Sequence, residues 1–168
     1  MSKKYMIVGL LAVVSVLIIF LFDSRIRSEE IKPIIGPSKF EKLGDDNRMR
    51  YGKYIETCDS YSRQGRHEEV VELANKAVAI APDEPQAYNF LCVSYAALRN
   101  YSEAIRVSEK YMQILKSRNL TSKDAVIRHA DFLLKGLGRE EAIRFLQLHG
   151  EIFSGRELDM YIQILKSS

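Results

Sequence analysis

The sequence has few of the residue types that build catalytic or metal sites. Its 168 residues include only two cysteines and three histidines. His67, His129 and His149 stand at no metal-ligand spacing from the cysteines. No glycine-rich phosphate loop, nucleophile elbow or HExxH pattern occurs. We therefore expect a protein that is not an enzyme and that holds no cofactor or metal ion.

The chain also lacks a marked excess of charge of either sign. It carries 25 Lys and Arg residues against 22 Asp and Glu residues. The first 32 residues hold five of these bases and three of these acids, which leaves 20 bases against 19 acids in the remainder. A nucleic-acid-binding domain normally shows a basic footprint. The near-neutral balance therefore argues against a nucleic-acid partner.

One segment has no charged residue at all. Residues 6–22 read MIVGLLAVVSVLIIFLF, a run that would span roughly 26 Å as an α-helix. A cleavable signal peptide would need a shorter apolar run and a site rich in small residues, and neither is present. A buried core helix would not be apolar on every face. We expect residues 1–22 to form an uncleaved single-pass membrane anchor.

The orientation of this anchor follows less directly from its flanks. Lys3 and Lys4 precede it, and Arg25, Arg27 and Lys32 follow it, so the distribution of positive charge does not decide the matter. A five-residue leader before the apolar run favours a signal anchor. We expect a single-pass membrane protein with a cytoplasmic N-terminus and an extracytoplasmic C-terminal domain.

Residues 23–45 are expected to connect the anchor to that domain. Pro33, Gly36 and Pro37 exclude a continuous helix there. Ile34, Ile35 and Phe40 are apolar enough to pack either on the bilayer surface or against the first helices. The prediction is a linker that holds the domain near the membrane.

A helical periodicity begins after residue 45 and repeats every 34 residues. The same residue types recur 34 positions later, so that Tyr54, Cys58 and Tyr61 correspond to Tyr88, Cys92 and Tyr95. A period of this length is typical of stacked helical hairpins, which share one core and present a groove. We predict helices over 46–63, 67–81, 84–98, 101–117, 122–136, 139–149 and 155–167. The residues expected in the core are Tyr54, Cys58, Tyr61, Ala77, Tyr88, Cys92, Tyr95 and Ala104.

Residues 51–118 resemble two tetratricopeptide repeats, at 51–84 and 85–118. The resemblance is carried by Tyr54, Cys58, Tyr61, Gly65, Ala74, Ala77 and Pro82, and by Tyr88, Leu91, Cys92, Tyr95, Tyr101 and Ala104. A degenerate third hairpin at about 119–150 and a capping helix at about 155–167 would complete a domain over 46–168. The predicted fold class is all-α, with an N-terminal transmembrane helix followed by a short solenoid of this type.

The two cysteines both fall where such a repeat places a small buried residue. Equivalent positions in neighbouring hairpins should lie one helix-packing distance apart, roughly 8–10 Å, which is too far for a disulfide. We expect Cys58 and Cys92 to be reduced core residues.

The resemblance also implies a binding surface on the first helix of each hairpin. The implied partner-binding residues on this concave face are Ile55, Asp59, Arg63, Gln86, Asn89 and Val93. Ile55 and Asp59 replace the lysine and asparagine that the chaperone-binding branch of the family uses to hold a terminal carboxylate. The expected function is a membrane-anchored scaffold or adaptor that recruits a protein or peptide partner. The alternative is a structural or assembly subunit of a larger membrane complex.

Overall fold

The computed structural model describes residues 39–120 and 122–167. Within these ranges the chain is all-α, with seven α-helices, two short 3₁₀-helices and no strand. The helices are η1 (Lys39–Lys42), α2 (Asp45–Arg63), α3 (His67–Ile80), α4 (Pro85–Ala97), α5 (Tyr101–Ser117), α6 (Lys123–Gly136), α7 (Arg139–Leu148), η2 (Gly150–Ile152) and α8 (Gly155–Ser167). Every α-helix begins and ends within one residue of its predicted bounds.

The predicted anchor at 6–22 and the linker up to residue 38 lie outside the described residues. In the part of the chain that is described, no helix is both long and apolar enough to cross a membrane.

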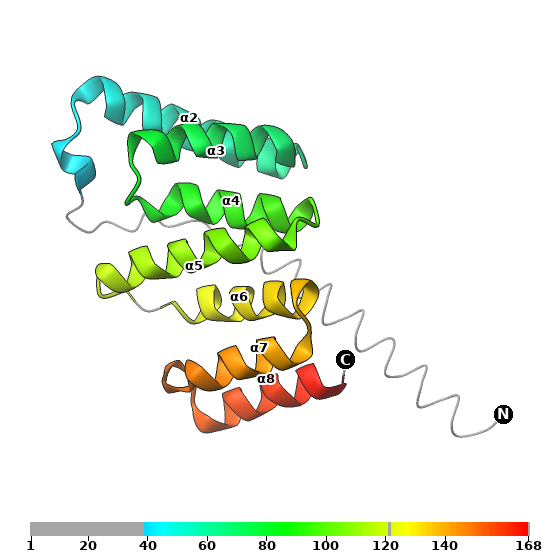
Figure 1. The fold of residues 1–168 in the computed structure, drawn as a ribbon. Helices are drawn as coiled ribbons and strands as arrows, with labels where there is room; N and C mark the ends of the chain where they lie inside the picture. Colours follow the sequence, from blue (N-terminus) through cyan, green and yellow to red (C-terminus); the bar gives the residue numbers. More distant parts are fainter. Residues whose placement is uncertain (1–38, 121, 168) are drawn as a thin grey trace. The chain divides into compact units, whose positions relative to one another are not determined.

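The helices stack in sequence order, each packed against the next (Figure 1). The pairs α2–α3, α4–α5 and α6–α7 form three antiparallel hairpins, and α8 packs on α7. Helix α2 also contacts α4, so the first helices of neighbouring hairpins lie side by side. The turns inside the three hairpins lie along one edge of the stack, where Arg139 of α7 also donates a hydrogen bond to the Lys166 carbonyl of α8.

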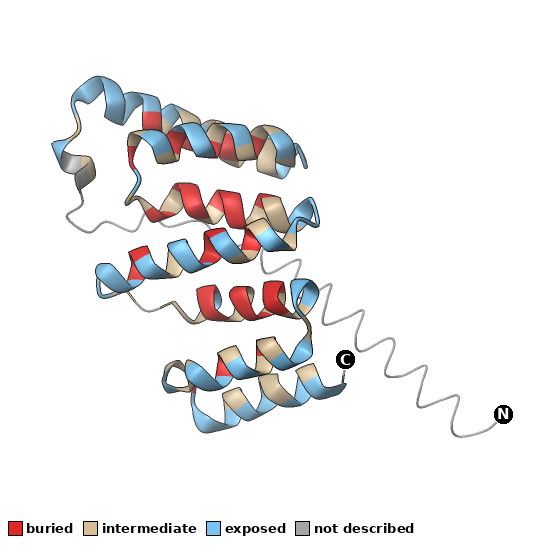
Figure 2. Ribbon diagram, viewed as in Figure 1, coloured by how far each residue is buried: buried red, intermediate tan, exposed pale blue. Residues whose placement is uncertain are grey.

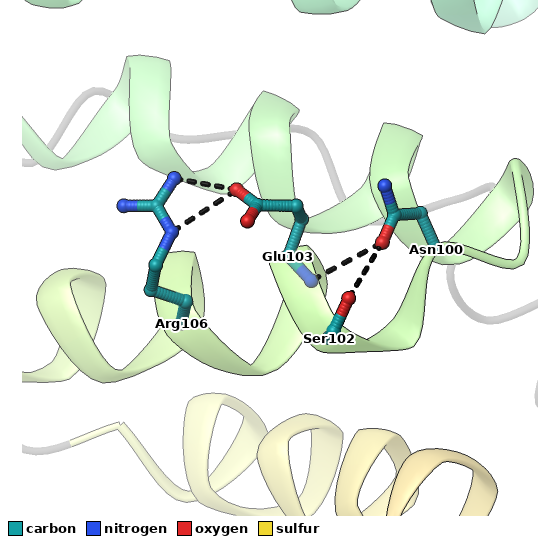
Figure 3. A network of polar contacts seen from close by, with 4 residues as sticks. All are labelled: Asn100, Ser102, Glu103 and Arg106. Atoms are coloured by element: carbon teal, nitrogen blue, oxygen red, sulfur yellow. Dashed lines mark hydrogen bonds and ion pairs between the residues drawn. The ribbon is translucent and has the colours of Figure 1, made fainter.

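Short polar and glycine-containing segments end the helices. Gly65 and Gly138 have φ values of 74° and 104°, and Arg99 occupies the corresponding turn of the second hairpin with φ 58°. Asn100 caps α5, because its side chain accepts a hydrogen bond from the Glu103 amide and another from the Ser102 hydroxyl (Figure 3). Glu103 in turn pairs with Arg106.

Helix α6 begins one residue later than predicted, because Ser122 caps it. The Ser122 hydroxyl accepts a hydrogen bond from the Ala125 amide at 3.1 Å. The helix consequently begins at Lys123. Gly150 was expected in a break between helices, and it lies in η2 without a positive φ.

Buried residues occur on every helix from α2 to α7 (Figure 2). Their hydrophobic side chains form two clusters. The larger runs from α2 to α5 and takes in Phe132 of α6. The smaller joins α6, α7 and the segment leading to α8, and is centred on Val126, Ala130, Leu146 and Phe153. Of the predicted core residues, Cys58, Ala77, Tyr88, Cys92 and Ala104 are buried. The remaining three, Tyr54, Tyr61 and Tyr95, are half-buried against the larger cluster.

Both cysteines are free and buried, as predicted. Desolvation raises the pKa of the Cys58 thiol to about 11 and that of Cys92 to about 12. Both thiols are therefore protonated at neutral pH, the form in which cysteine is a poor nucleophile.

The end of the expected linker packs against the helices. Phe40, in η1, meets the Tyr51 ring edge-on with their centroids 5.0 Å apart. Leu43 is also packed against the larger cluster. Phe40 was expected to pack either on the bilayer surface or against the first helices, and the structure shows it against the first helices.

Candidate functional site

The candidate binding face is formed by the first helices of the three hairpins, α2, α4 and α6. Contacts between α2 and α4 place the first two side by side. Helix α6 is tied to α4 by a hydrogen bond from the Arg128 guanidinium to the Asn89 side-chain oxygen. We call the surface carried by these three helices the concave face.

Ile55 is not accessible on this face. It was expected to reach a ligand, but it is only 7 % exposed and packs in the larger cluster. The reason is that α2 meets both α3 and α4, so two of its faces are covered. Replacing Ile55 would damage the core as well as any binding surface.

Asp59 and Arg63 form an ion pair along α2. Their charged atoms lie 3.0 Å apart, and the Arg63 side chain is 79 % exposed. The four-residue spacing brings them together on one side of the helix. An exposed pair of this kind contributes little to stability, so Arg63 can exchange its partner for a ligand group at small cost.

Helix α4 supplies the other three predicted residues. Gln86 and Val93 are half-buried. Asn89 is also half-buried, but its side-chain oxygen accepts the hydrogen bond from Arg128. Asn89 was predicted to contact a partner. The structure shows that its oxygen already holds two helices together, while its amide N–H groups remain the part that could meet a ligand.

Helix α6 carries a second ion pair that sequence reasoning missed. Asp131 and Lys135 lie 2.6 Å apart. Helices α4 and α6 begin 38 residues apart, as do α5 and α7, so Asp131 and Lys135 occupy the places held by Val93 and Ala97 in α4. Asp59 and Arg63 occupy the same places in α2, 34 residues earlier. The change of spacing from 34 to 38 hid this correspondence in the sequence.

The concave face therefore alternates in character from one hairpin to the next. Its middle helix presents Val93, Ala96 and Ala97, while each flanking helix presents an acid followed by a base. The described residues contain no group of His, Cys, Asp or Glu side chains that could hold a metal ion. Such an arrangement offers shape, apolar contact and salt-bridge partners to a ligand.

In comparisons with known proteins, no family model and no curated protein matches this chain.

Proposed function

We propose that this protein is a membrane-anchored adaptor of the tetratricopeptide-repeat type, which binds a protein or peptide partner on its concave face. The observation that carries the proposal is the shared surface of three first helices, two bearing exposed ion pairs and the middle one bearing small apolar side chains. The hairpins also keep buried small residues where close helix approach requires them, with Cys58, Ala77 and Ala104 at 0 % exposure. These positions are the ones that support the resemblance to this repeat family.

The partner's chemistry follows from the alternation along the face. An apolar side chain would rest on Val93 and Ala97, where the absence of long side chains leaves room. Charged groups on either side of it would meet Arg63 and Asp59 or Lys135 and Asp131. An extended or helical peptide with one central apolar anchor and flanking charges satisfies both requirements.

The comparison of two surface variants tests this proposal. Val93→Glu introduces a charge at the centre of the concave face, whereas Asn75→Glu places the same charge on an exposed position of α3. Tagged full-length protein, extracted in mild detergent after cross-linking in native cells, should lose its co-purifying partner with Val93→Glu and keep it with Asn75→Glu. Equal capture by both variants, and by Arg63→Glu combined with Gln86→Ala, would remove the concave face as the binding site.

The membrane anchor is a separate part of the proposal, and it rests on the charge-free run at 6–22. Mass spectrometry of the native protein should recover the peptide that begins at Met1, from the membrane fraction. A mature chain that begins after Phe22 would contradict an uncleaved anchor. Protease treatment of intact membranes should cut the domain only from the extracytoplasmic side.

A second candidate function is a subunit of a larger membrane assembly. Leu137 and Leu148 are 63 % and 69 % exposed, and exposed large apolar side chains are common at stable interfaces. Native mass measurement after detergent extraction separates the two functions. A fixed stoichiometric complex favours the subunit, and a free chain that binds its partner reversibly favours the adaptor.

A further inference from the structure

The junction between α5 and α6 is built from polar residues where the preceding junction is apolar. Ser108 stands at the same place in α5 as Ala74 in α3, and His129 stands at the same place in α6 as Leu91 in α4. All four side chains are buried. The same helix packing is thus made once with an alanine and a leucine and once with a serine and a histidine.

The serine and histidine are hydrogen-bonded to each other inside the stack. The Ser108 Oγ atom lies 2.6 Å from the His129 Nδ1 atom. The Ser108 hydroxyl is also 2.9 Å from the Ile105 carbonyl, to which it can donate. When it does so, the Nδ1 atom of the neutral His129 ring carries the hydrogen and donates to the Ser108 oxygen. A serine bound in this way is not an activated nucleophile.

The rest of the surroundings of His129 are poorly suited to a positive charge. Its ring packs on Phe145 of α7 with the centroids 4.5 Å apart. Phe145 packs in turn on His149, which follows α7 and whose Nδ1 atom lies 3.0 Å from the Phe145 carbonyl. Helix α5 places the Ser108 hydroxyl against the His129 ring, and α7 places Phe145 against it. His149, at the end of α7, is the titratable group among these neighbours. Among the described residues, no acidic group shifts the pKa of His129.

This environment gives the junction a definite dependence on pH. Burial, and to a lesser extent the nearby His149, lowers the pKa of His129 from 6.5 to about 4. An opened junction binds the proton more readily than a closed one. The stability that His129 provides is therefore complete above about pH 6.5 and is lost as the pH falls toward 4.

We propose that the junction between α5 and α6 is a pH-sensitive joint, which opens on acidification and releases α6, α7 and α8 from α5. The helices beyond the joint share most of the smaller cluster, so they stay together as a unit when they separate. Opening withdraws Phe132 of α6 from the larger cluster and exposes Met112 of α5, which packs on the smaller one. The larger cluster contains no buried histidine.

Opening the joint would also dismantle the concave face. Arg128 precedes His129 in α6, and it holds Asn89 of α4. Release of α6 breaks this link and removes Asp131 and Lys135 from the surface. Acidification would thus release a bound partner, a consequence that rests on the proposed function, whereas the opening itself does not.

Hydrogen exchange of the full-length protein in detergent tests the joint without any partner. After correction for intrinsic exchange rates, the amides of α6 and α7 should open roughly 20-fold more at pH 5 than at pH 7, given a closed-state pKa of about 4 and an open-state value of 6.5. Helices α3 and α4 should change little. Uniform acid loss of protection in all helices, or none in α6 and α7, would overturn the proposal.

Two variants assign the effect to the buried pair. Ser108→Ala combined with His129→Leu copies the apolar junction of α3 and α4, and it should abolish the acid response of α6 and α7. His67→Gln, which alters a histidine at the start of α3, should leave the response unchanged. An acid response that survives in the double variant would contradict the proposal.

A titration of the unaltered protein covers the case in which the double variant does not fold. By NMR the His129 ring signals should titrate with a midpoint well below 6.5, together with changes in the signals of α7. A midpoint near 6.5, with α6 and α7 still packed on α5, would contradict the joint.

Discussion

The two junctions between hairpins differ in chemistry although they occupy the same place in the stack. At matching positions, α3 and α4 bury Ala74 and Leu91, whereas α5 and α6 bury Ser108 and His129. The apolar pair gains stability from burial at any pH. The polar pair is stable only while its hydrogen bond is made and its ring is neutral. The same packing of helices can therefore be stable at any pH at one junction and stable only near neutral pH at the next.

The same contrast appears in the cores on either side of the conditional junction. The larger cluster contains most of the buried apolar side chains, whereas α8 contributes no buried residue to the smaller cluster (Figure 2). We expect the C-terminal helices to depend on a few large side chains.

The largest effect is expected from removing one of those side chains. Leu146 is 2 % exposed and occupies the same place in α7 as Ala74 in α3 and Ser108 in α5. Leu146→Ala should lower the free energy of unfolding of α6–α8 by about 2–5 kcal/mol. Denaturant unfolding followed by circular dichroism measures it, with the exposed Leu148→Ala as control. Equal losses in both variants would mean that the smaller cluster is not a core.

A somewhat smaller effect should follow from overfilling the larger cluster. Ala104 is fully buried in the α4–α5 hairpin, so Ala104→Leu should destabilise the chain by about 1–3 kcal/mol. The matched control is Glu109→Leu, on an exposed position of the same helix. A thermal melt that did not move with Ala104→Leu would show that the two helices are not in close contact there.

Ion pairs offer a third comparison of the two regions. Arg118 bonds to the Glu84 carboxylate at 2.8 Å and to the Asp83 carbonyl at 2.6 Å, and both charged side chains are largely buried. Arg118→Ala should cost about 1–2 kcal/mol, because it leaves the Glu84 carboxylate without its partner. The pair of Lys123 with Glu157 is more exposed, so Lys123→Ala should cost less. The reverse order in chemical denaturation would contradict this ranking.

The smallest expected change is in thiol labelling, which separates the two regions directly. Cys58 and Cys92 both lie in the larger cluster, and burial raises the pKa of each thiol. Both should react slowly with 4,4′-dithiodipyridine at pH 7 and remain slow at pH 5, where α6–α8 have opened. Fast labelling at pH 5 would show that acid opens the whole stack.

The positions of the helices could be predicted from the sequence, because their ends carry strong local signals. Gly65 and Gly138 allow positive φ values, Asn100 caps α5, and Pro85 begins α4. Such signals depend only on neighbouring residues. The burial of small side chains such as Cys58 was also predictable, because it repeats with the period of the hairpins.

Contacts between hairpins could not be predicted in the same way. Ile55 was placed on the surface because the repeat pattern does not show that it is buried in the larger cluster. The hydrogen bonds of Asn89 with Arg128 and of Ser108 with His129 join residues 39 and 21 positions apart. From the sequence, His129 was expected to hold no metal ion. It is in the core, but nothing in the sequence pairs it with Ser108.

The claim that the concave face binds a partner is tested most directly by site-specific photocross-linking in living cells. A photoreactive amino acid is placed at Val93 on the concave face, or at Asn75 of α3 as the matched control. We expect one protein to become attached at position 93 and not at position 75. Attachment of that protein at position 75, with none at position 93, would contradict it.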